Sequence, residues 1–151
     1  MGGAAILCGH AAARAGAGTV RIVSPGANRT AVQTALPEAL FIDRDEDALE
    51  EVAGSAAAIV AGPGMGTDGD ADSALRRMLS AAGGGLLLDA DALTLLAADP
   101  ALLTDGLRGR CVLTPHPGEM GRLLGVETAD VTADPFAAVE RARAIRAVHA
   151  V

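Results

Sequence analysis

At residues 111–119 the chain reads CVLTPHPGE, so a short apolar run leads directly into a histidine held between two prolines. A run this short and apolar is typical of a buried strand in a parallel sheet. Each proline fixes its own φ and biases the preceding residue away from the helix, so Thr114 and His116 are expected to be extended. The stretch therefore predicts a rigid polar loop that presents an imidazole where a strand ends.

The same arrangement occurs twice upstream. Apolar runs at 56–60 and 86–88 lead into the polar segments GPGMGTD at 62–68 and DADAL at 89–93. Helices are expected at 2–14, 27–36, 45–52, 71–82, around 93–96, at 118–124 and from 135 to the end, with another strand at 19–23 and a brief apolar run at 40–42. Apolar strands that alternate with helices predict an α/β three-layer sandwich, a mostly parallel sheet covered by helices on both faces. No linker, repeat or change of composition divides residues 1–151, so one domain is expected.

Composition narrows the function classes. The 151 residues are 50% hydrophobic and 21% charged, a globular balance, but only 1% aromatic with no Trp or Tyr, so platforms for stacking nucleic-acid bases are not expected. The net charge of −7 argues against nucleic acid and anionic membrane surfaces as partners. Every basic residue is an arginine, which excludes a lysine Schiff base or lysine nucleophile within these residues.

The two cysteines, Cys8 and Cys111, lie in apolar runs without metal-type spacing. They are expected to be buried free thiols in a reducing compartment. No segment approaches the ~18 apolar residues that span a bilayer, and no basic region precedes the apolar start as in a signal peptide. A cytoplasmic protein is therefore predicted.

Ligands of an open parallel sheet bind beyond the carboxyl ends of its strands, so the three segments after these strands are expected to line one cleft. Gly62, Gly64 and Gly66 would let the main chain approach a ligand closely, because glycine has no side chain and accepts positive φ. The alternative is a tight strand-to-helix turn, since Gly-Pro-Gly commonly ends a strand. His116 is likewise either a ligand-binding imidazole or a solvated turn residue.

Three carboxylates accompany these segments. Asp89, at a strand end, is expected to order a water, a ligand hydroxyl or a neighbouring loop, and Asp91 to be the N-cap of the next helix. Glu119 falls in the first helical turn after Pro117, where a negative charge is favourable whatever the function. No spacing among these residues demands a metal, so no metal ligand is assigned. No catalytic residue is assigned within the 151 residues either.

Five motifs follow one another in a particular order: GAA at 3–5, RAGAG at 14–18, AGPGMG at 61–66, LDADAL at 88–93 and TPHPGEM at 114–120. Their order and separation resemble the ADP-dependent NAD(P)H-hydrate dehydratase family over nearly the whole chain. TPHPGE is the most specific of them, and the glycine-rich loop is moderately specific.

This resemblance implies a ribokinase-like fold and a lyase reaction of metabolite repair. In that reaction (S)-NADHX or (S)-NADPHX, the hydrated cofactor, is dehydrated to NADH or NADPH while ADP is converted to AMP. The resemblance also implies ADP or ATP as co-substrate, with Mg²⁺. By the family pattern, Ala4, Gly64 and His116 match positions that contact the hydrated dinucleotide. Because an imidazole can hydrogen-bond in either protonation state, His116 is assigned to binding rather than to general base catalysis.

Parts of the family pattern are missing from the 151 residues. The start lacks the family's first strand and the glycine-bearing segment ahead of Gly3, and the end lacks a Lys-Gly stretch and the Gly-Thr-Gly-Asp segment with the catalytic aspartate. We therefore expect a partial domain, truncated at both ends, that carries the substrate-side half of the site and is inactive alone. Unpaired sheet edges would favour association, so a homo-oligomer stays open.

Two other functions stay open. A kinase of the same fold that acts on a vitamin alcohol would share the sheet, although residues 114–119 favour the dehydratase. A catalytically inactive fragment would bind nucleotide weakly or not at all.

Overall fold

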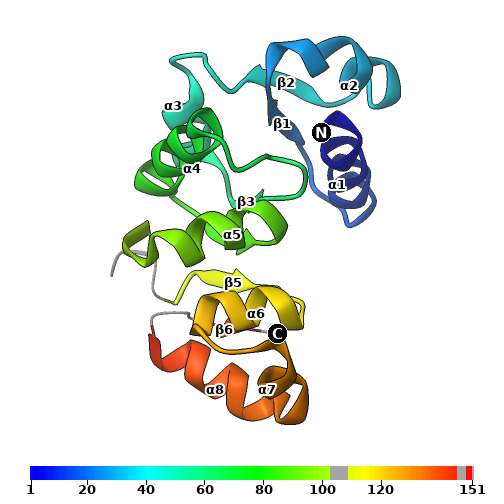
Figure 1. The fold of residues 1–151 in the computed structure, drawn as a ribbon. Coiled ribbons are helices and arrows are strands. Elements are labelled where there is room, and N and C mark those ends of the chain that lie inside the picture. The colour runs from blue at the N-terminus through cyan, green and yellow to red at the C-terminus, as the bar shows by residue number, and fades with distance from the viewer. Residues whose placement is uncertain (103–108, 146–148, 151) are drawn as a thin grey trace.

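The computed structural model describes residues 1–102, 109–145 and 149–150, in which short strands alternate with helices (Figure 1). The elements in chain order are α1 (Gly2–Arg14), β1 (Arg21–Ser24), the 3₁₀ turn η1 (Gly26–Asn28), α2 (Arg29–Ala35), β2 (Leu40–Asp43), α3 (Leu49–Ser55), β3 (Ala58–Ala61), α4 (Gly69–Ala81), β4 (Gly85–Leu88), α5 (Ala90–Ala98), η2 (Pro100–Leu102), β5 (Cys111–Leu113), α6 (Pro117–Leu124), α7 (Thr128–Ala133), α8 (Pro135–Ile145) and β6 (His149–Ala150). The predicted alternation of strands and helices is confirmed.

All strand pairs are parallel, as predicted, but they form two sheets. One contains β1 and β2, and the other has the order β3-β4-β5-β6. The edges of β1 and β3 that face each other have no strand partner within the described ranges, and a cavity of about 660 Å³ lies between them. Unpaired edges, expected from the sequence, are therefore present between the two sheets.

The largest core lies between the four-stranded sheet and helices α3, α4 and α5. Leu86, Leu88 and Leu113 on one sheet face are at most 3% exposed and pack with residues of these helices. On the other face, Val60 is 54% exposed and Leu87 is only half-buried. The helices that cover this sheet among the described residues thus protect one face much better than the other.

Two smaller cores complete the molecule. Ile22 and Phe41 of the β1-β2 sheet pack with α1 and α2, while Met120 of α6 packs with α7 and α8. Figure 1 shows α1 and α2 with the two-stranded sheet at one end and α6 to α8 at the other. None of the described helices is both long and apolar enough to cross a membrane.

Several predicted element boundaries were wrong. Helix α3 begins at Leu49 rather than residue 45, because Asp43 accepts hydrogen bonds from the Asp45 amide through its side chain and the Glu46 amide through its carbonyl, which makes a turn. Helix α7 was not predicted; it starts shortly after the left-handed Gly125 ends α6. Helix α8 (Pro135–Ile145) does not run to the end as predicted, because residues 149–150 add a strand to the sheet; residues 146–148 and 151 lie outside the described residues.

Candidate functional site

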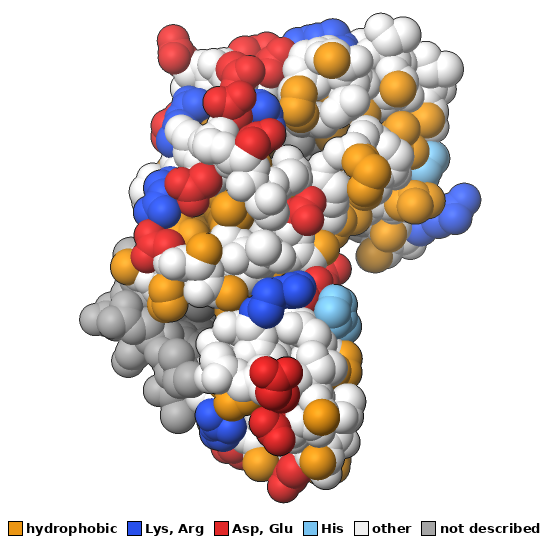
Figure 2. Space-filling view, in the orientation of Figure 1, with side chains coloured by type: hydrophobic (Ala, Val, Ile, Leu, Met, Phe, Trp, Pro, Cys, Tyr) orange, Lys and Arg blue, Asp and Glu red, His pale blue; other side chains and the backbone are white. Residues whose placement is uncertain are grey.

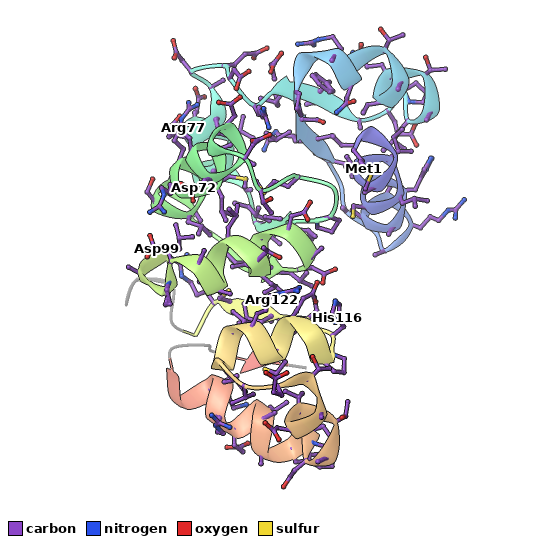
Figure 3. All side chains as sticks on the ribbon, in the orientation of Figure 1. Met1, Asp72, Arg77, Asp99, His116 and Arg122 are labelled. Atoms are coloured by element: carbon purple, nitrogen blue, oxygen red, sulfur yellow. The ribbon has the colours of Figure 1, made fainter. Side chains whose placement is uncertain are left out.

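The ends of three neighbouring strands meet at one edge of the sheet. The Asp89 amide donates to the Ala61 carbonyl at 3.0 Å, and the Thr114 amide donates to the Leu88 carbonyl at 3.2 Å. These bonds continue the parallel ladder into the loops, so the segments after β3, β4 and β5 begin side by side. Figure 3 labels Met1 at the start of α1 and His116 at the start of α6, and in Figure 2 the surface steps inward between the α1 end of the molecule and α6.

Ala4 and Gly64 are in direct proximity. A Cβ added to Gly64 would lie 2.9 Å from the Ala4 Cβ and 2.8 Å from the Met1 carbonyl, and Gly64 has a φ of +68°. The main-chain nitrogen of Met1 also donates to the Gly64 carbonyl. The start of α1 therefore rests directly on the glycine-rich loop, and only glycine fits at position 64.

Gly62 packs against a different neighbour from Gly64. It is buried, with a φ of +122°, and a Cβ there would lie 1.7 Å from the Asp89 carbonyl oxygen. The close approach at Gly62 is thus to the neighbouring strand end. It allows the two loops to pack, whereas the half-buried Gly64 lies against the start of α1.

The expected roles of Asp89 and Asp91 are exchanged. Asp89, not Asp91, is at the N-cap position of α5, and its side chain makes no capping bond. Asp91 lies in the first turn, where its carboxylate accepts a hydrogen bond from the Gly66 amide at 2.8 Å. Asp91 is therefore the residue that orders the neighbouring loop. Ala90 between them has a φ of +48°, the single positive value of a non-glycine residue among those described.

His116 is the N-cap of α6. Its Nδ1 accepts from the Gly118 amide at 3.0 Å and the Glu119 amide at 3.4 Å, so the ring proton is on Nε2. The side chain is 63% exposed, and Nε2 is 3.4 Å from the Glu119 carboxylate. The imidazole is thus fixed by its own loop while its Nε2–H edge remains available to donate to a ligand.

Glu119 completes this arrangement. It is only 8% exposed, and its carboxylate accepts a hydrogen bond from the His116 amide at 2.9 Å. Together the two residues form a reciprocal capping box, with Pro117 in the first helical turn. Glu119 therefore holds the loop in shape, and its carboxylate is largely withdrawn from the surface.

The two thiols are both free, but only Cys111 is fully buried, whereas Cys8 is half-buried, contrary to expectation. Burial raises the pKa of the Cys111 thiol to about 11. Burial, and secondarily the negative charge of Asp89, also raise the pKa of Cys8.

One polar group was overlooked in the sequence. The Thr114 hydroxyl, at the end of β5, is buried and has no hydrogen-bond partner in the structure. Its position directly before Pro115 and after an apolar strand was the available signal. Within the described ranges, no three His, Cys, Asp or Glu side chains gather as a metal site would require.

A parallel sheet with loops gathered at its strand ends is typical of the ribokinase-like α/β proteins, the class of a similar solved structure. A solved ribokinase-like superfamily protein from Enterococcus faecalis matches with a TM-score of 0.87 and 26% identity, over 99% of this chain and 52% of that one. An ADP/ATP-dependent NAD(P)H-hydrate dehydratase from Bacillus subtilis, co-crystallized with ATP/Mg²⁺ and soaked with CoA, matches with a TM-score of 0.71 and 27% identity, over 97% and 52% of the two chains.

Within that class, the chain belongs to the NAD(P)H-hydrate dehydratase family, whose family model matches residues 1–148. An ADP-dependent (S)-NAD(P)H-hydrate dehydratase of Lactiplantibacillus plantarum is 40% identical over 137 residues, 87% of this chain and 48% of that protein. A bifunctional NAD(P)H-hydrate repair enzyme of Vibrio cholerae is 40% identical over 142 residues, 93% of this chain and 28% of that protein. The chain thus spans about half the length, or less, of these relatives.

Proposed function

We propose that residues 1–151 form the substrate-binding part of an ADP-dependent NAD(P)H-hydrate dehydratase. The complete enzyme would convert (S)-NADHX and (S)-NADPHX to NADH and NADPH while ADP becomes AMP. Family membership supports the reaction, and the relatives named above supply the substrate class. The observation that carries the proposal is the contact of Ala4 with Gly64 at the same sheet edge that bears the His116 loop.

The chemistry of the cleft suits a dinucleotide. The small residues Ala4 and Gly64 bring main-chain groups rather than bulky side chains to this edge, where α1 meets the glycine-rich loop, and the exposed His116 Nε2–H offers one donor. Ala4, Gly64 and His116 are therefore proposed as substrate contacts, with Gly62, Gly66 and Glu119 as the residues that shape the two loops.

Adenine nucleotide use is proposed from the relatives. The Lactiplantibacillus relative is ADP-dependent, and the Bacillus structure was co-crystallized with ATP/Mg²⁺. The described residues do not supply a cluster of metal ligands of their own. Mg²⁺ is therefore proposed only as the companion of the nucleotide phosphates, and no step of binding by this chain depends on it.

The proposal is tested by calorimetric titration of the 151-residue chain with NADPH hydrate. We expect one molecule to bind per chain, and no heat with hydroxymethylpyrimidine or a thiazole alcohol, the substrates that a vitamin-alcohol kinase would take. Binding of the alcohols without binding of NADPH hydrate would contradict the proposal.

His116→Asn provides the matched variant. Asparagine is a good N-cap residue, so α6 should keep its start while the imidazole Nε2–H is lost. We expect affinity for NADPH hydrate to fall about tenfold, the loss typical of one well-placed hydrogen bond. An unchanged affinity with an unchanged melting temperature would remove His116 from the binding site.

A further inference from the structure

We propose that Asp89 is an additional substrate-binding residue, whose carboxylate accepts a hydrogen bond from a hydroxyl or amide N–H of the hydrated dinucleotide. The inference rests on the proposed function, because it requires a ligand that contacts both the Gly64 loop and the His116 loop. The Asp89 side chain makes no capping bond in the fold, so it is free to take this role.

The sheet order places Asp89 in the path of such a ligand. Strand β4 lies between β3 and β5, and neighbouring strands of a sheet are about 4.8 Å apart. Gly64 follows β3, His116 follows β5, and Asp89 directly follows β4. A ligand that reaches from one outer loop to the other must therefore cross the end of β4.

The main chain of Asp89 is fully used, but its side chain is not. The amide donates to the Ala61 carbonyl at 3.0 Å, and the carbonyl accepts from the Ala92 amide at 3.1 Å and packs against Gly62. The carboxylate, although at an N-cap position, makes no capping bond, and within the described residues it has no ion-pair partner. The neighbouring Asp91 is already committed to Gly66.

The electrostatic surroundings of α1 agree with the position that the strand order gives Asp89. Cys8 is four residues after Ala4 and so lies on the same face of α1, the face that rests on the glycine-rich loop. The charge of Asp89, after burial, is the second cause of the raised pKa of Cys8. Asp89 therefore lies within electrostatic reach of the α1 face that carries a proposed substrate contact.

An independent feature at the same edge also points to a missing partner. The Thr114 hydroxyl, on the adjacent strand end, is buried without a hydrogen-bond partner. Buried polar groups are normally paired, so an unpaired one calls for an explanation such as a ligand, a water or an ion that completes its hydrogen bonding. Two neighbouring strand ends thus each carry a polar group that the described protein leaves unpaired.

Whether substitution of Asp89 weakens or strengthens substrate binding distinguishes a hydrogen bond from a long-range charge effect. The dinucleotide carries phosphates, and the chain has a net charge of −7, so removing a negative charge should by itself strengthen binding. Removing a hydrogen-bond acceptor should weaken it. Weaker binding after substitution of Asp89 therefore cannot arise from long-range charge.

The test is calorimetric titration of the 151-residue chain with NADPH hydrate and, separately, with NADPH. The variants are Asp89→Ala, Asp89→Asn, which removes the charge but keeps an acceptor oxygen, and Asp130→Asn, an exposed carboxylate on α7 that serves as the charge control. We expect Asp89→Ala to weaken binding of NADPH hydrate about tenfold, Asp89→Asn to weaken it less, and Asp130→Asn to change it less than twofold.

The two ligands identify the donor. A loss confined to NADPH hydrate would assign the bond to the hydroxyl of the hydrated ring, and an equal loss for both would assign it to a ribose hydroxyl or the carboxamide. Unchanged or tighter binding in Asp89→Ala, with the melting temperature retained, would overturn the role of Asp89 and leave the proposed function standing. If the wild-type chain binds neither ligand, the proposed function itself fails. Asp89→Ser, which keeps a preferred N-cap residue, replaces the alanine variant if that variant does not fold.

Discussion

The two loops at the ends of β3 and β5 reach the same sheet edge by opposite means. The Gly62–Gly66 loop is held from outside, by α1 through Gly64, by the Asp89 carbonyl against Gly62 and by the Asp91 carboxylate on Gly66. The His116 loop is held from within, by prolines and a capping box of its own residues. The glycine-rich loop thus takes its shape from its neighbours, whereas the proline-rich loop is shaped by its own residues.

The largest expected effect comes from adding one carbon to the first loop. Gly62→Ala would place a Cβ 1.7 Å from the Asp89 carbonyl at a φ of +122°. Backbone strain and overpacking together should lower the free energy of unfolding by about 4 kcal/mol, measured by urea denaturation.

Gly66→Ala is the control for this substitution. It also has a positive φ, +88°, but its nearest neighbours would be 3.8 Å away, so only the backbone cost of about 1 kcal/mol should remain. If both variants lose the same stability, the contact with Asp89 does not hold the loop.

The second largest effect is expected when the pH is raised, and it concerns Cys111 on strand β5, which leads into the His116 loop. The pKa of Cys111 is raised by burial to about 11, above its unfolded value near 9. The native state therefore keeps a proton that the unfolded state loses, so stability should fall between pH 9 and pH 11, by at most about 2 to 3 kcal/mol. Cys111→Ala should flatten this dependence, measured as urea unfolding against pH, whereas Cys8→Ala should leave most of it. A dependence unaffected by Cys111→Ala would contradict this assignment.

The next largest effect is expected from disrupting the capping box of His116 and Glu119. Glu119→Ala leaves the His116 amide without its acceptor and should cost about 1 to 2 kcal/mol, while Glu119→Gln, which can still accept that bond, should cost only a few tenths. Hydrogen exchange should show the loss confined to the start of α6. Spread of the change to the glycine-rich loop would show that the two loops are not independent.

The smallest expected effect is that of Asp91→Ala. It removes the hydrogen bond to the Gly66 amide from a half-buried position and should cost about 1 kcal/mol. The Cys8 thiol, on the α1 face near this loop, should react faster with iodoacetamide, and the Cys111 thiol should not. An equal change at both thiols would indicate general loosening.

The difference between the loops also explains how far the sequence could predict this molecule. The structure of residues 111–119 depends on local interactions. Its strand, its extended proline-containing loop and the helix that follows were predicted, because each follows from neighbouring residues. The role of Asp91 was not, since its partner Gly66 is 25 residues away and an acidic residue near a helix start is ordinarily a cap.

Other features depended equally on distant contacts. Helix α7 is short, and four of its six residues are Thr, Asp or Val, which have modest helix propensity; it is stabilised where Val131 packs against Met120 and α8. The division into two sheets also gave no local signal, because each strand has the same apolar pattern whether or not a neighbour pairs with it. The family resemblance predicted from the motifs was confirmed, whereas the binding roles of Ala4, Gly64 and His116 remain proposals.

The central claim is that these two differently built loops bind one ligand together. Hydrogen exchange of the 151-residue chain, measured with and without saturating NADPH hydrate, tests it most directly. We expect slower exchange at the amides of both 62–66 and 114–119, with the same dependence on ligand concentration. Protection of only one segment, or protection of the two at different ligand concentrations, would contradict a single shared cleft.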